Sequence, residues 1–310
     1  MRFGDKAREL MDSHGVSLRE LARRAHFDAG HLSKVLNGYK PASAELASRL
    51  DTALDADGSL VALADERVTE AVGAPRRVDA AVLDAVAVML AATRRLEDAT
   101  SAATVMPSVR EYTTMVNRFA RDSDAVRRAA TVGLLSELHQ YAGWLYIPMR
   151  RWSDSERYLD RAVVLGMEAN DPQRTVTALS FGAYGAMRRG DIRRASALND
   201  AASRDTSVAP GLHCYLVHQG AEILAGDDNA EARRLLHDAE RLAEQIDPTD
   251  LTDSGYWYTP EFFAGSRAFI LDKLGEHDRA KALMAESLAA LPAEWRTSEW
   301  AARRRAFLAA

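Results

Sequence analysis

One stretch decides the fold of the first part of the chain: Ser17-Leu-Arg-Glu-Leu-Ala-Arg-Arg-Ala-His-Phe-Asp-Ala-Gly-His-Leu-Ser-Lys-Val-Leu-Asn-Gly38. Its apolar residues recur at intervals of three and four on both sides of a break at residues 26–28, which predicts two short amphipathic helices. Ser17 and Asp28 can cap these helices, because their side-chain oxygens accept hydrogen bonds from N-terminal amides. Gly38 can supply the left-handed residue that closes the second helix. The stretch therefore predicts a helix-turn-helix that offers its second helix to DNA.

Apolar patterns on both sides extend this motif to a small helical domain of four or five helices. One supporting helix precedes the motif, and Pro41 and Ser43 open another after it. Further along, a long helical pattern is followed by a second helix that we expect to start at Pro107. The predicted organisation is a DNA-binding domain at residues 1–64, a linker at 65–78, a helical connector at 79–135 and a repeat domain at 136–310.

The motif resembles the lambda-repressor-like, or xenobiotic-response-element-type (XRE), family of DNA-binding domains. The matching residues are Leu21-Ala22, Leu32-Ser33, Gly38, and Pro41 with Ser43. Two positions depart from the family pattern, because His26 stands in place of the turn glycine and Leu36 in place of a glutamate. The resemblance covers about the first fifth of the chain and implies a sequence-specific contact between the second helix and double-stranded DNA.

The net charge of −5 becomes compatible with DNA binding once it is divided along the chain. Residues 1–40 carry eight Lys or Arg against five Asp or Glu, whereas residues 41–66 carry one against six. This division places positive charge around the motif. The candidate phosphate contacts are Arg19, Arg23, Arg24, Lys34 and Lys40, and their number predicts salt-dependent affinity. The plainer interpretation of Arg23 and Arg24 is a solvated helix face.

Ten residues of the motif are predicted to contact DNA, through base edges or the phosphate backbone. They are Ser17, Arg19, Asp28, Ala29, Gly30, His31, Ser33, Lys34, Asn37 and Lys40.

Composition excludes several other classes of protein. The chain has no run of eighteen apolar residues and no apolar signal region, so we expect a cytoplasmic protein without a membrane segment. The single cysteine, Cys214, excludes an internal disulfide and suits a reducing compartment. We find no phosphate-binding loop, no dinucleotide-binding turn and no metal-ligand cluster. The prediction is therefore a non-enzymatic protein without cofactor or metal, in which Cys214 is a half-buried residue of a helix.

Small residues recur at fixed offsets of twelve and then seven positions in the second half of the chain. The four sets are Gly143/Ser155/Ala162, Ala183/Ala195/Ala202, Gly220/Ala232/Ala239 and Ala268/Ala280/Ser287. Such residues allow two antiparallel helices to approach closely, and Gly190, Gly226 and Gly275 can turn the chain between them. Four sets predict four helix pairs.

These spacings resemble the tetratricopeptide repeat (TPR) between Ser136 and Pro292, although the intervals between repeats exceed the usual length. The first repeat departs from the pattern, with Arg150-Arg151 in place of the turn glycine. The resemblance implies an all-α chain, in which a TPR-like solenoid with a concave groove follows the DNA-binding domain. We expect a capping helix from Trp295 to Ala310.

The first helix of each pair would direct its side chains into the groove. The candidate ligand contacts are Glu137, Gln140, Trp144, Ser180, Tyr184, Arg188, Phe262 and Phe269. An aromatic groove with a few polar groups suits a peptide or a small amphipathic molecule. The alternatives are that Trp144 and Phe269 pack between repeats and that Glu137 pairs with Arg188. The aromatic run at residues 256–258 could form a lid or pack against the next helix.

Together, the two parts resemble one-component regulators of Gram-positive bacteria that sense peptide pheromones, and related regulators of actinomycetes. The resemblance implies a homodimer that reads a pseudo-palindromic operator with half-sites about 34 Å apart. A ligand in the groove would modulate operator binding, and repression is the commoner outcome for this type of domain. One alternative is a TPR interaction scaffold with an accessory helix-turn-helix domain. Another is a phage-type or antitoxin repressor without a ligand.

Overall fold

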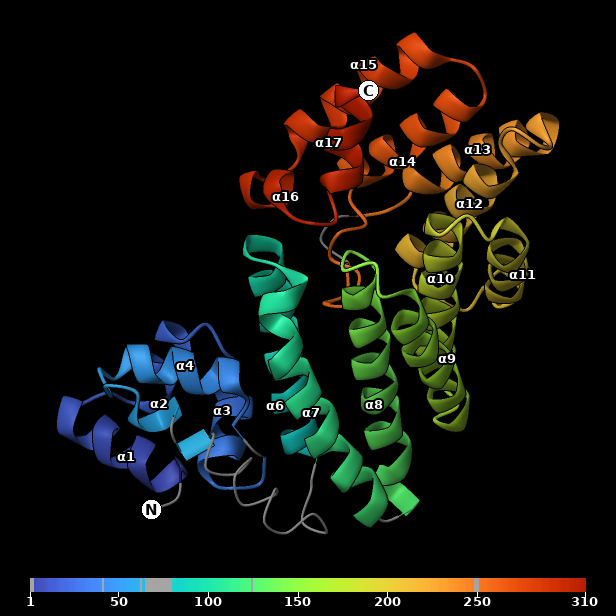
Figure 1. Cartoon of the computed structure of the whole chain (residues 1–310). Helices are drawn as coiled ribbons and strands as arrows, with labels where there is room; N and C mark the ends of the chain where they lie inside the picture. Colours follow the sequence, from blue (N-terminus) through green and yellow to red (C-terminus); the bar gives the residue numbers. More distant parts are fainter. Residues whose placement is uncertain (1–2, 41, 62, 65–79, 124, 248–250) are drawn as a thin grey trace. The chain divides into compact units, whose positions relative to one another are not determined.

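The structure is a computed structural model that describes residues 3–40, 42–61, 63–64, 80–123, 125–247 and 251–310. All regular secondary structure in these residues is helical, as the sequence predicts (Figure 1). The chain divides into two compact units, one made of residues 1–90 and 115–131 and the other of residues 91–114 and 132–310. No helix in the described ranges is long and apolar enough to cross a membrane.

The helix-turn-helix domain contains four described helices around one apolar core. They are α1 (Phe3–His14), α2 (Leu18–Arg24), α3 (Ala29–Leu36) and α4 (Ala44–Ala53). Leu21, Leu32 and Leu46 are fully buried at its centre. These positions come from the apolar stripes of three different helices, so the predicted periodicity builds the core.

The predicted caps hold the ends of these helices. The side chain of Ser17 accepts a hydrogen bond from the Glu20 amide at 3.3 Å, and that of Asp28 accepts one from the His31 amide at 2.7 Å. Ser43 caps α4 in the same way, at 3.1 Å from the Leu46 amide. Pro41, expected to open this helix, lies outside the described residues.

Two left-handed residues set the turns of the motif. Gly38 has φ +76° directly after α3, as predicted. His26 has φ +54° between α2 and α3, at the position where the related family has glycine. The turn therefore keeps its left-handed backbone, and a residue with a Cβ bears the strain.

α1 supports the end of α3 through a close approach. A Cβ on Gly4 would lie 2.1 Å from the carbonyl oxygen of Leu36, so only glycine fits there. The Arg8 guanidinium donates to the same carbonyl at 2.5 Å and to Asn37 Oδ1 at 3.0 Å. The first of these bonds satisfies a backbone carbonyl at the end of α3, where carbonyl groups lack intrahelical partners.

Three long helices follow: α6 (Ala80–Ala99), α7 (Ala102–Asp122) and α8 (Ala125–Tyr146). The boundary between the two compact units passes through all three. The prediction that Pro107 starts a helix is wrong, because α7 begins five residues earlier. Ser101 provides the cap, since its hydroxyl accepts a hydrogen bond from the Thr104 amide at 3.2 Å. The predicted linker at 65–78 lies outside the described residues, and the predicted domain boundaries stay a prediction.

The predicted repeats form consecutive helix pairs, which can be followed from α8 to α15 in Figure 1. The remaining helices of the pairs are α9 (Trp152–Glu168), α10 (Pro172–Arg188), α11 (Ile192–Ala202), α12 (Pro210–Leu224), α13 (Asn229–Ala243), α14 (Pro260–Lys273) and α15 (His277–Ala290). The small residues lie where the helices meet. A Cβ on Gly143 would lie 2.6 Å from Leu159, and the Ser155 hydroxyl donates to the Gly143 carbonyl at 2.8 Å.

The turns within the pairs are left-handed in all four repeats. Gly190, Gly226 and Gly275 have φ between +85° and +98°. The first pair lacks this glycine, and Arg150 adopts φ +55° instead. The repeat pattern therefore describes the backbone even at the position where its residue type departs from it.

The chain ends in two short helices, α16 (Ala293–Thr297) and α17 (Ala302–Ala309). The expectation of one capping helix from Trp295 to Ala310 is therefore wrong. Ser298 interrupts the helix with φ −57° and ψ 157°, and it is buried. On α17, Arg304 donates to the carbonyl of Phe262 at 2.7 Å and to the Ser287 hydroxyl at 3.1 Å. The last repeat is thus covered by α17.

Candidate functional site

Helix α3, the predicted recognition helix, presents polar side chains on the face opposite its core stripe. Leu32, Val35 and Leu36 are buried, whereas Lys34 and Gly30 are exposed. The remaining predicted contacts on and around α3 are half-buried or exposed as well: Ala29, His31, Ser33, Asn37 and Lys40. The sequence therefore places the candidate DNA contacts on an accessible surface of one short helix.

Three of the predicted DNA contacts have a structural role. Ser17 and Asp28 cap α2 and α3, and Asn37 both accepts from Arg8 and donates to the Ser33 hydroxyl at 3.4 Å. Capped helix N-termini are common contacts for phosphate groups, so this role and DNA contact are compatible. His31 and Lys34 therefore stay the main predicted side-chain contacts to bases.

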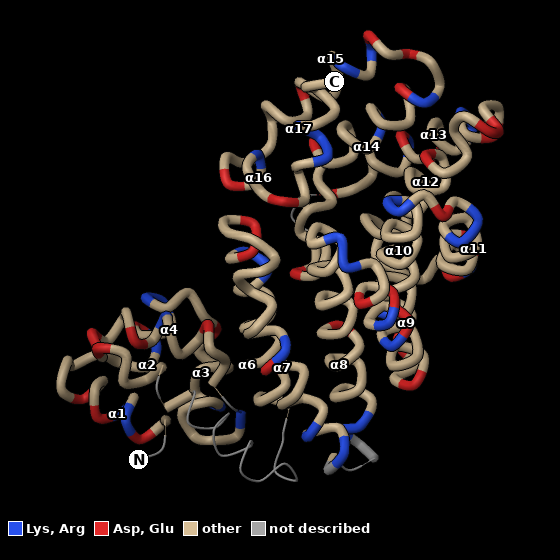
Figure 2. The backbone as a smooth tube through the Cα atoms, viewed as in Figure 1, with Lys and Arg blue, Asp and Glu red and all other residues tan. Residues whose placement is uncertain are grey.

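Some charged side chains of the domain form ion pairs and others do not, and both signs of charge occur on α1, α2 and α4 (Figure 2). Glu20 binds Arg23 at 2.6 Å and Arg24 at 2.9 Å. The ion pairs of Arg23 and Arg24 thus agree with the plainer interpretation, in which the two residues belong to a solvated helix face. Within the described residues, Arg19, Lys34 and Lys40 form no ion pair and keep their charge available.

Tyr39 is a candidate contact that the sequence reasoning missed. Its side chain is 82% exposed beside Gly38, at the end of the recognition helix. An aromatic residue with this exposure is unusual on a protein surface. Its position after a glycine turn, in a basic stretch, is a signal that could have identified it.

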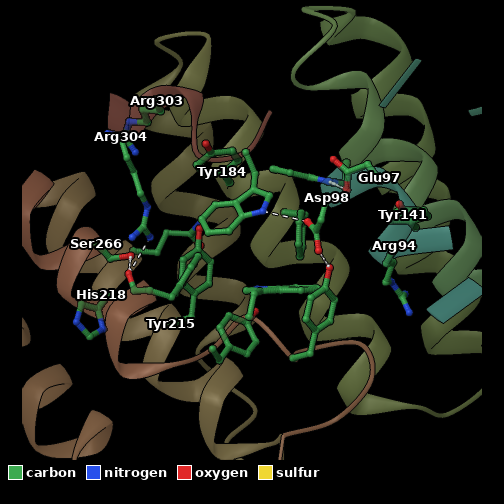
Figure 3. A pocket seen from close by; sticks show the side chains of 18 of the residues that line it. Arg94, Glu97, Asp98, Tyr141, Tyr184, Tyr215, His218, Ser266, Arg303 and Arg304 are labelled. Carbon is green, nitrogen blue, oxygen red and sulfur yellow. Dashed lines mark hydrogen bonds between the residues drawn. The ribbon is translucent and has the colours of Figure 1, made fainter. Parts of the chain in front are cut away.

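A cavity of about 110 Å³ lies inside the second compact unit, residues 91–114 and 132–310, which we call the repeat unit (Figure 3). Side chains of α8, α10, α12 and α14 line it, and these are the first helices of the four pairs. Residues of α6, α17 and the segment before α14 complete the wall. The predicted groove is therefore present, and the neighbouring helices partly enclose it.

Five of the eight predicted ligand contacts line the cavity: Gln140, Trp144, Tyr184, Phe262 and Phe269. The other three lie outside its lining. Glu137 pairs with Arg94 at 2.8 Å and with Arg174 at 3.0 Å, so its expected alternative partner, Arg188, is wrong. Arg188 instead lies over the Tyr184 ring, and Ser180 is fully buried.

Two adjacent acidic residues of α6 form one side of the cavity. Asp98 accepts hydrogen bonds from the Tyr256 hydroxyl and from Trp300 Nε1, the latter at 3.1 Å. Glu97 is 3% exposed, and its Oε2 accepts a long bond from Trp144 Nε1 at 3.4 Å. Burial, followed by the neighbouring charge of Asp98, raises the pKa of Glu97 to about 8.

Basic residues of α17 lie on the opposite side of the cavity from this acidic pair (Figure 3). Arg303 forms an ion pair with Glu222 of α12 and lies 3.6 Å from the centre of the Phe269 ring. Arg304 is 4% exposed and is engaged by carbonyl oxygens of α14, and burial lowers its pKa to about 10. Both guanidinium groups are therefore already engaged within the protein.

Aromatic rings form most of the remaining wall. Trp144 meets Phe181 edge to face at 5.5 Å between ring centres, and Phe181 meets Trp257 at 6.2 Å. Tyr258 is buried and stacks on Phe263 of α14. The aromatic run at 256–258 thus packs against the next helix and also lines the cavity. Its role as a lid stays a prediction.

Cys214 and His218 of α12 belong to the core of the repeat unit. The thiol is buried and lies 3.5 Å from the Ala239 carbonyl, and burial raises its pKa to about 12. His218 stacks on Phe263, and burial lowers its pKa to about 4. A thiol in this state is a poor nucleophile. No cluster of metal-ligating side chains occurs in the part of the chain that the structure describes.

The sequence reasoning missed the cavity residues that come from outside the first helices of the repeats. Glu97 and Asp98 lie on the predicted connector, and Trp300, Arg303 and Arg304 lie on the predicted cap. Their signal in the sequence is composition, because an adjacent acidic pair lies near the end of a long helical pattern and a triple arginine follows a tryptophan. That signal does not show which residues these side chains contact, because the contacts depend on how distant helices pack.

Comparisons with known proteins support the prediction of a helix-turn-helix domain at the start of the chain. Residues 2–64 match the family model of the helix-turn-helix domain, so the chain carries such a domain at its start. Among solved structures, the chain is similar to Bacillus thuringiensis PlcR in its crystal structure with the peptide PapR7 and DNA. The identity is 10%, the TM-score is 0.46, and the likeness covers 99% of each chain. No curated protein matches the chain.

Proposed function

We propose that the chain is a transcription regulator that binds a DNA operator through α3 and senses a peptide or small molecule in the cavity of its repeat unit. The partly enclosed cavity carries this proposal, because it gives a chain with a helix-turn-helix domain a space that can hold a ligand. Its size exceeds the space of one water molecule several times. Aromatic walls with a few polar groups are typical of ligand sites.

The proposed DNA contacts are the side chains of the domain that are accessible and form no ion pair within the described residues. His31 and Lys34 lie on the exposed face of α3, where they can reach base edges in the major groove. Arg19 and Lys40 can bind phosphates, and the N-terminus of α2, whose cap Ser17 is uncharged, favours another. Two copies bound as a homodimer would read half-sites about 34 Å apart. Such a protein acts as a binding module without catalytic chemistry, and we propose repression in the cytoplasm as its output.

Selection of duplex DNA by the full chain, at fixed salt, tests this function. We expect a preferred sequence, and His31→Ala to weaken its binding by on the order of tenfold while relaxing preference at one base position. Lys34→Ala weakens binding through base or phosphate contact. The control is Lys281→Ala on α15, which removes an exposed charge outside the helix-turn-helix.

Two results would contradict the proposal. Unchanged affinity in both α3 variants would exclude α3 as the recognition helix. A chain without any sequence preference that retains a stoichiometric protein partner would instead be an interaction scaffold.

A further inference from the structure

On the acidic side of the cavity, the carboxyl group of Glu97 has fewer hydrogen bonds than that of Asp98. Both oxygens of Asp98 have donors, from Tyr256 and Trp300. Glu97 has one long bond to Oε2, whereas its Oε1 has no hydrogen-bond partner of normal geometry within the described residues. The Tyr141 hydroxyl on the same wall is likewise buried without such a partner, and its interaction with Glu97 only partly offsets the raised pKa. A buried polar atom in this state costs free energy unless another group, such as a ligand, completes its bonds.

The cationic groups of the cavity are already committed elsewhere. Arg94, one turn before Glu97 on α6, binds Glu137 of α8. Across the cavity, Arg303 binds Glu222, and Arg304 binds carbonyl oxygens of α14. The position beside Glu97 is thus acidic and lacks a protein cation as a partner.

A second buried oxygen in the cavity, Oε1 of Gln219, also lacks a hydrogen-bond partner within the described residues. Gln219 of α12 is 2% exposed, and its Nε2 donates to the Ser180 carbonyl at 3.1 Å. This bond fixes the amide so that Oε1 is the other end, and Oε1 has no hydrogen-bond partner. Both Glu97 and Gln219 line the cavity. Once Glu97 is ionised, a ligand that completes the bonds of Glu97 and Gln219 donates hydrogens to both, whereas the Tyr141 hydroxyl can accept or donate.

Aromatic rings surround the acidic pair. Trp144, Tyr141, Tyr256 and Trp300 line the cavity together with Glu97 and Asp98, and Phe181 and Tyr184 continue the wall. Aromatic faces attract organic cations, and they also bury an apolar body. A carboxylate beside such rings matches an ammonium group attached to a hydrocarbon.

We propose that the ligand of this cavity is an organic ammonium compound with an aromatic or aliphatic body, whose ammonium group binds Glu97 beside Asp98. This inference rests on the proposed sensing role and names the chemistry of its ligand. The ammonium group can belong to a small free amine or to the N-terminus of a peptide, because both present the same donors.

The charge state of Glu97 gives the binding a characteristic pH dependence. Facing groups are Asp98 and Arg94 on the same helix, Tyr141 and Glu137 on α8, Tyr256 before α14, and Glu299 before α17. Because Glu97 has a pKa of about 8, a cation that binds near neutral pH must displace a proton. Affinity for the amine therefore rises with pH and levels off above about pH 8.

Titration of the full chain with phenethylamine tests the proposal. Tryptophan fluorescence and calorimetry measure the binding. Phenethyl alcohol and hydrocinnamate serve as neutral and anionic analogues. We expect the amine to bind most tightly, with affinity that rises about tenfold per pH unit between about pH 6 and 8. A second arm compares a short apolar peptide with and without N-terminal acetylation. Loss on acetylation, without binding of the free amine, assigns the ammonium group to a peptide.

Glu97→Gln keeps the shape of the side chain and removes its charge. We expect at least about tenfold weaker amine binding and no pH slope, whereas Glu286→Gln on the exposed face of α15 leaves both unchanged. Equal binding of phenethylamine and phenethyl alcohol, or a pH slope that persists in Glu97→Gln, overturns the proposal. If the chain selects an operator but no amine or free peptide N-terminus binds, the ligand class is wrong and the DNA-binding role stands.

Discussion

Glu97 is a residue whose environment lowers the stability of the folded protein. Its carboxyl group is buried next to Asp98, and the nearby arginine is bound to another acid. Its pKa of about 8 in the folded protein compares with an ordinary value of 4.5. Proteins retain such groups where a ligand or a reaction uses them more often than for packing.

We expect Glu97→Gln to stabilise the protein at alkaline pH. Below about pH 4.5 the group is protonated in the folded and unfolded chains, so it has no pH-dependent effect. As the pH rises to about 8, only the unfolded chain ionises, and the folded state loses up to ~5 kcal/mol. Denaturant unfolding of the repeat unit at acidic and alkaline pH measures this. Equal stability of both proteins at alkaline pH would contradict it.

His26 carries backbone strain that glycine would remove. At φ +54° a side chain with a Cβ is strained, so His26→Gly should stabilise the helix-turn-helix domain by roughly 0.5–1 kcal/mol. Gly38→Ala, at φ +76°, is the reverse test and should destabilise it by about 1 kcal/mol. Hydrogen exchange of amides in α2 and α3 reports both changes. Slower exchange in Gly38→Ala would contradict the argument.

The residues of the candidate sites divide according to what sequence spacing encodes. Caps and left-handed turns are local, so Ser17, Asp28 and Gly38 could be predicted from their neighbours alone. The bonds of Asp98 join it to residues more than 150 positions away. Such a site depends on how distant helices pack, and no local pattern specifies it.

At the scale of helices, small residues determine how closely the repeats pack. A Cβ on Gly166 of α9 would lie 2.9 Å from the backbone nitrogen of Thr175, at the start of α10. On α10, a Cβ on Gly185 would make only an ordinary contact, at 3.4 Å from Ile147. The two glycines therefore have different roles despite their similar helical setting.

We expect Gly166→Ala to destabilise the repeat unit by about 1–3 kcal/mol, because the contacted backbone has no room to shift without separating α9 from α10. Gly185→Ala should be neutral or stabilising by up to about 1 kcal/mol, since alanine favours helix. Thermal unfolding of both variants gives the comparison. A Gly166→Ala protein as stable as Gly185→Ala would show that the two helices are not closely packed.

The ends of helices show where sequence patterns fail. Proline suits the first turn of a helix, so Pro107 suggested a start, but the Ser101 cap lies six residues before it and decides the boundary. The repeat periodicity, in contrast, predicted four pairs because one set of small residues recurs in each. Repetition thus supplied evidence that a single proline or aromatic residue lacks.

At the scale of the whole molecule, α6 is the helix that carries the acidic pair of the cavity and, like α7 and α8, crosses the boundary between the two compact units. Its residues 80–90 belong to one compact unit, and residues 91–99, including Glu97 and Asp98, belong to the other. A ligand that binds Glu97 therefore acts directly on a helix shared by both units. We therefore predict that the shared helix α6 carries the effect of a bound ligand to the DNA-binding domain.

If ligand binding changes operator affinity, the operator must change ligand affinity by the same factor. Couplings of this kind typically amount to about 5–150-fold. We expect the dissociation constant of phenethylamine, measured at about pH 8, to differ by such a factor with and without saturating operator. Glu97→Gln should bind the operator with an affinity that no longer responds to the amine. If the amine binds with one affinity in both conditions, the cavity holds its ligand without influencing DNA binding, and the regulatory link through α6 is wrong.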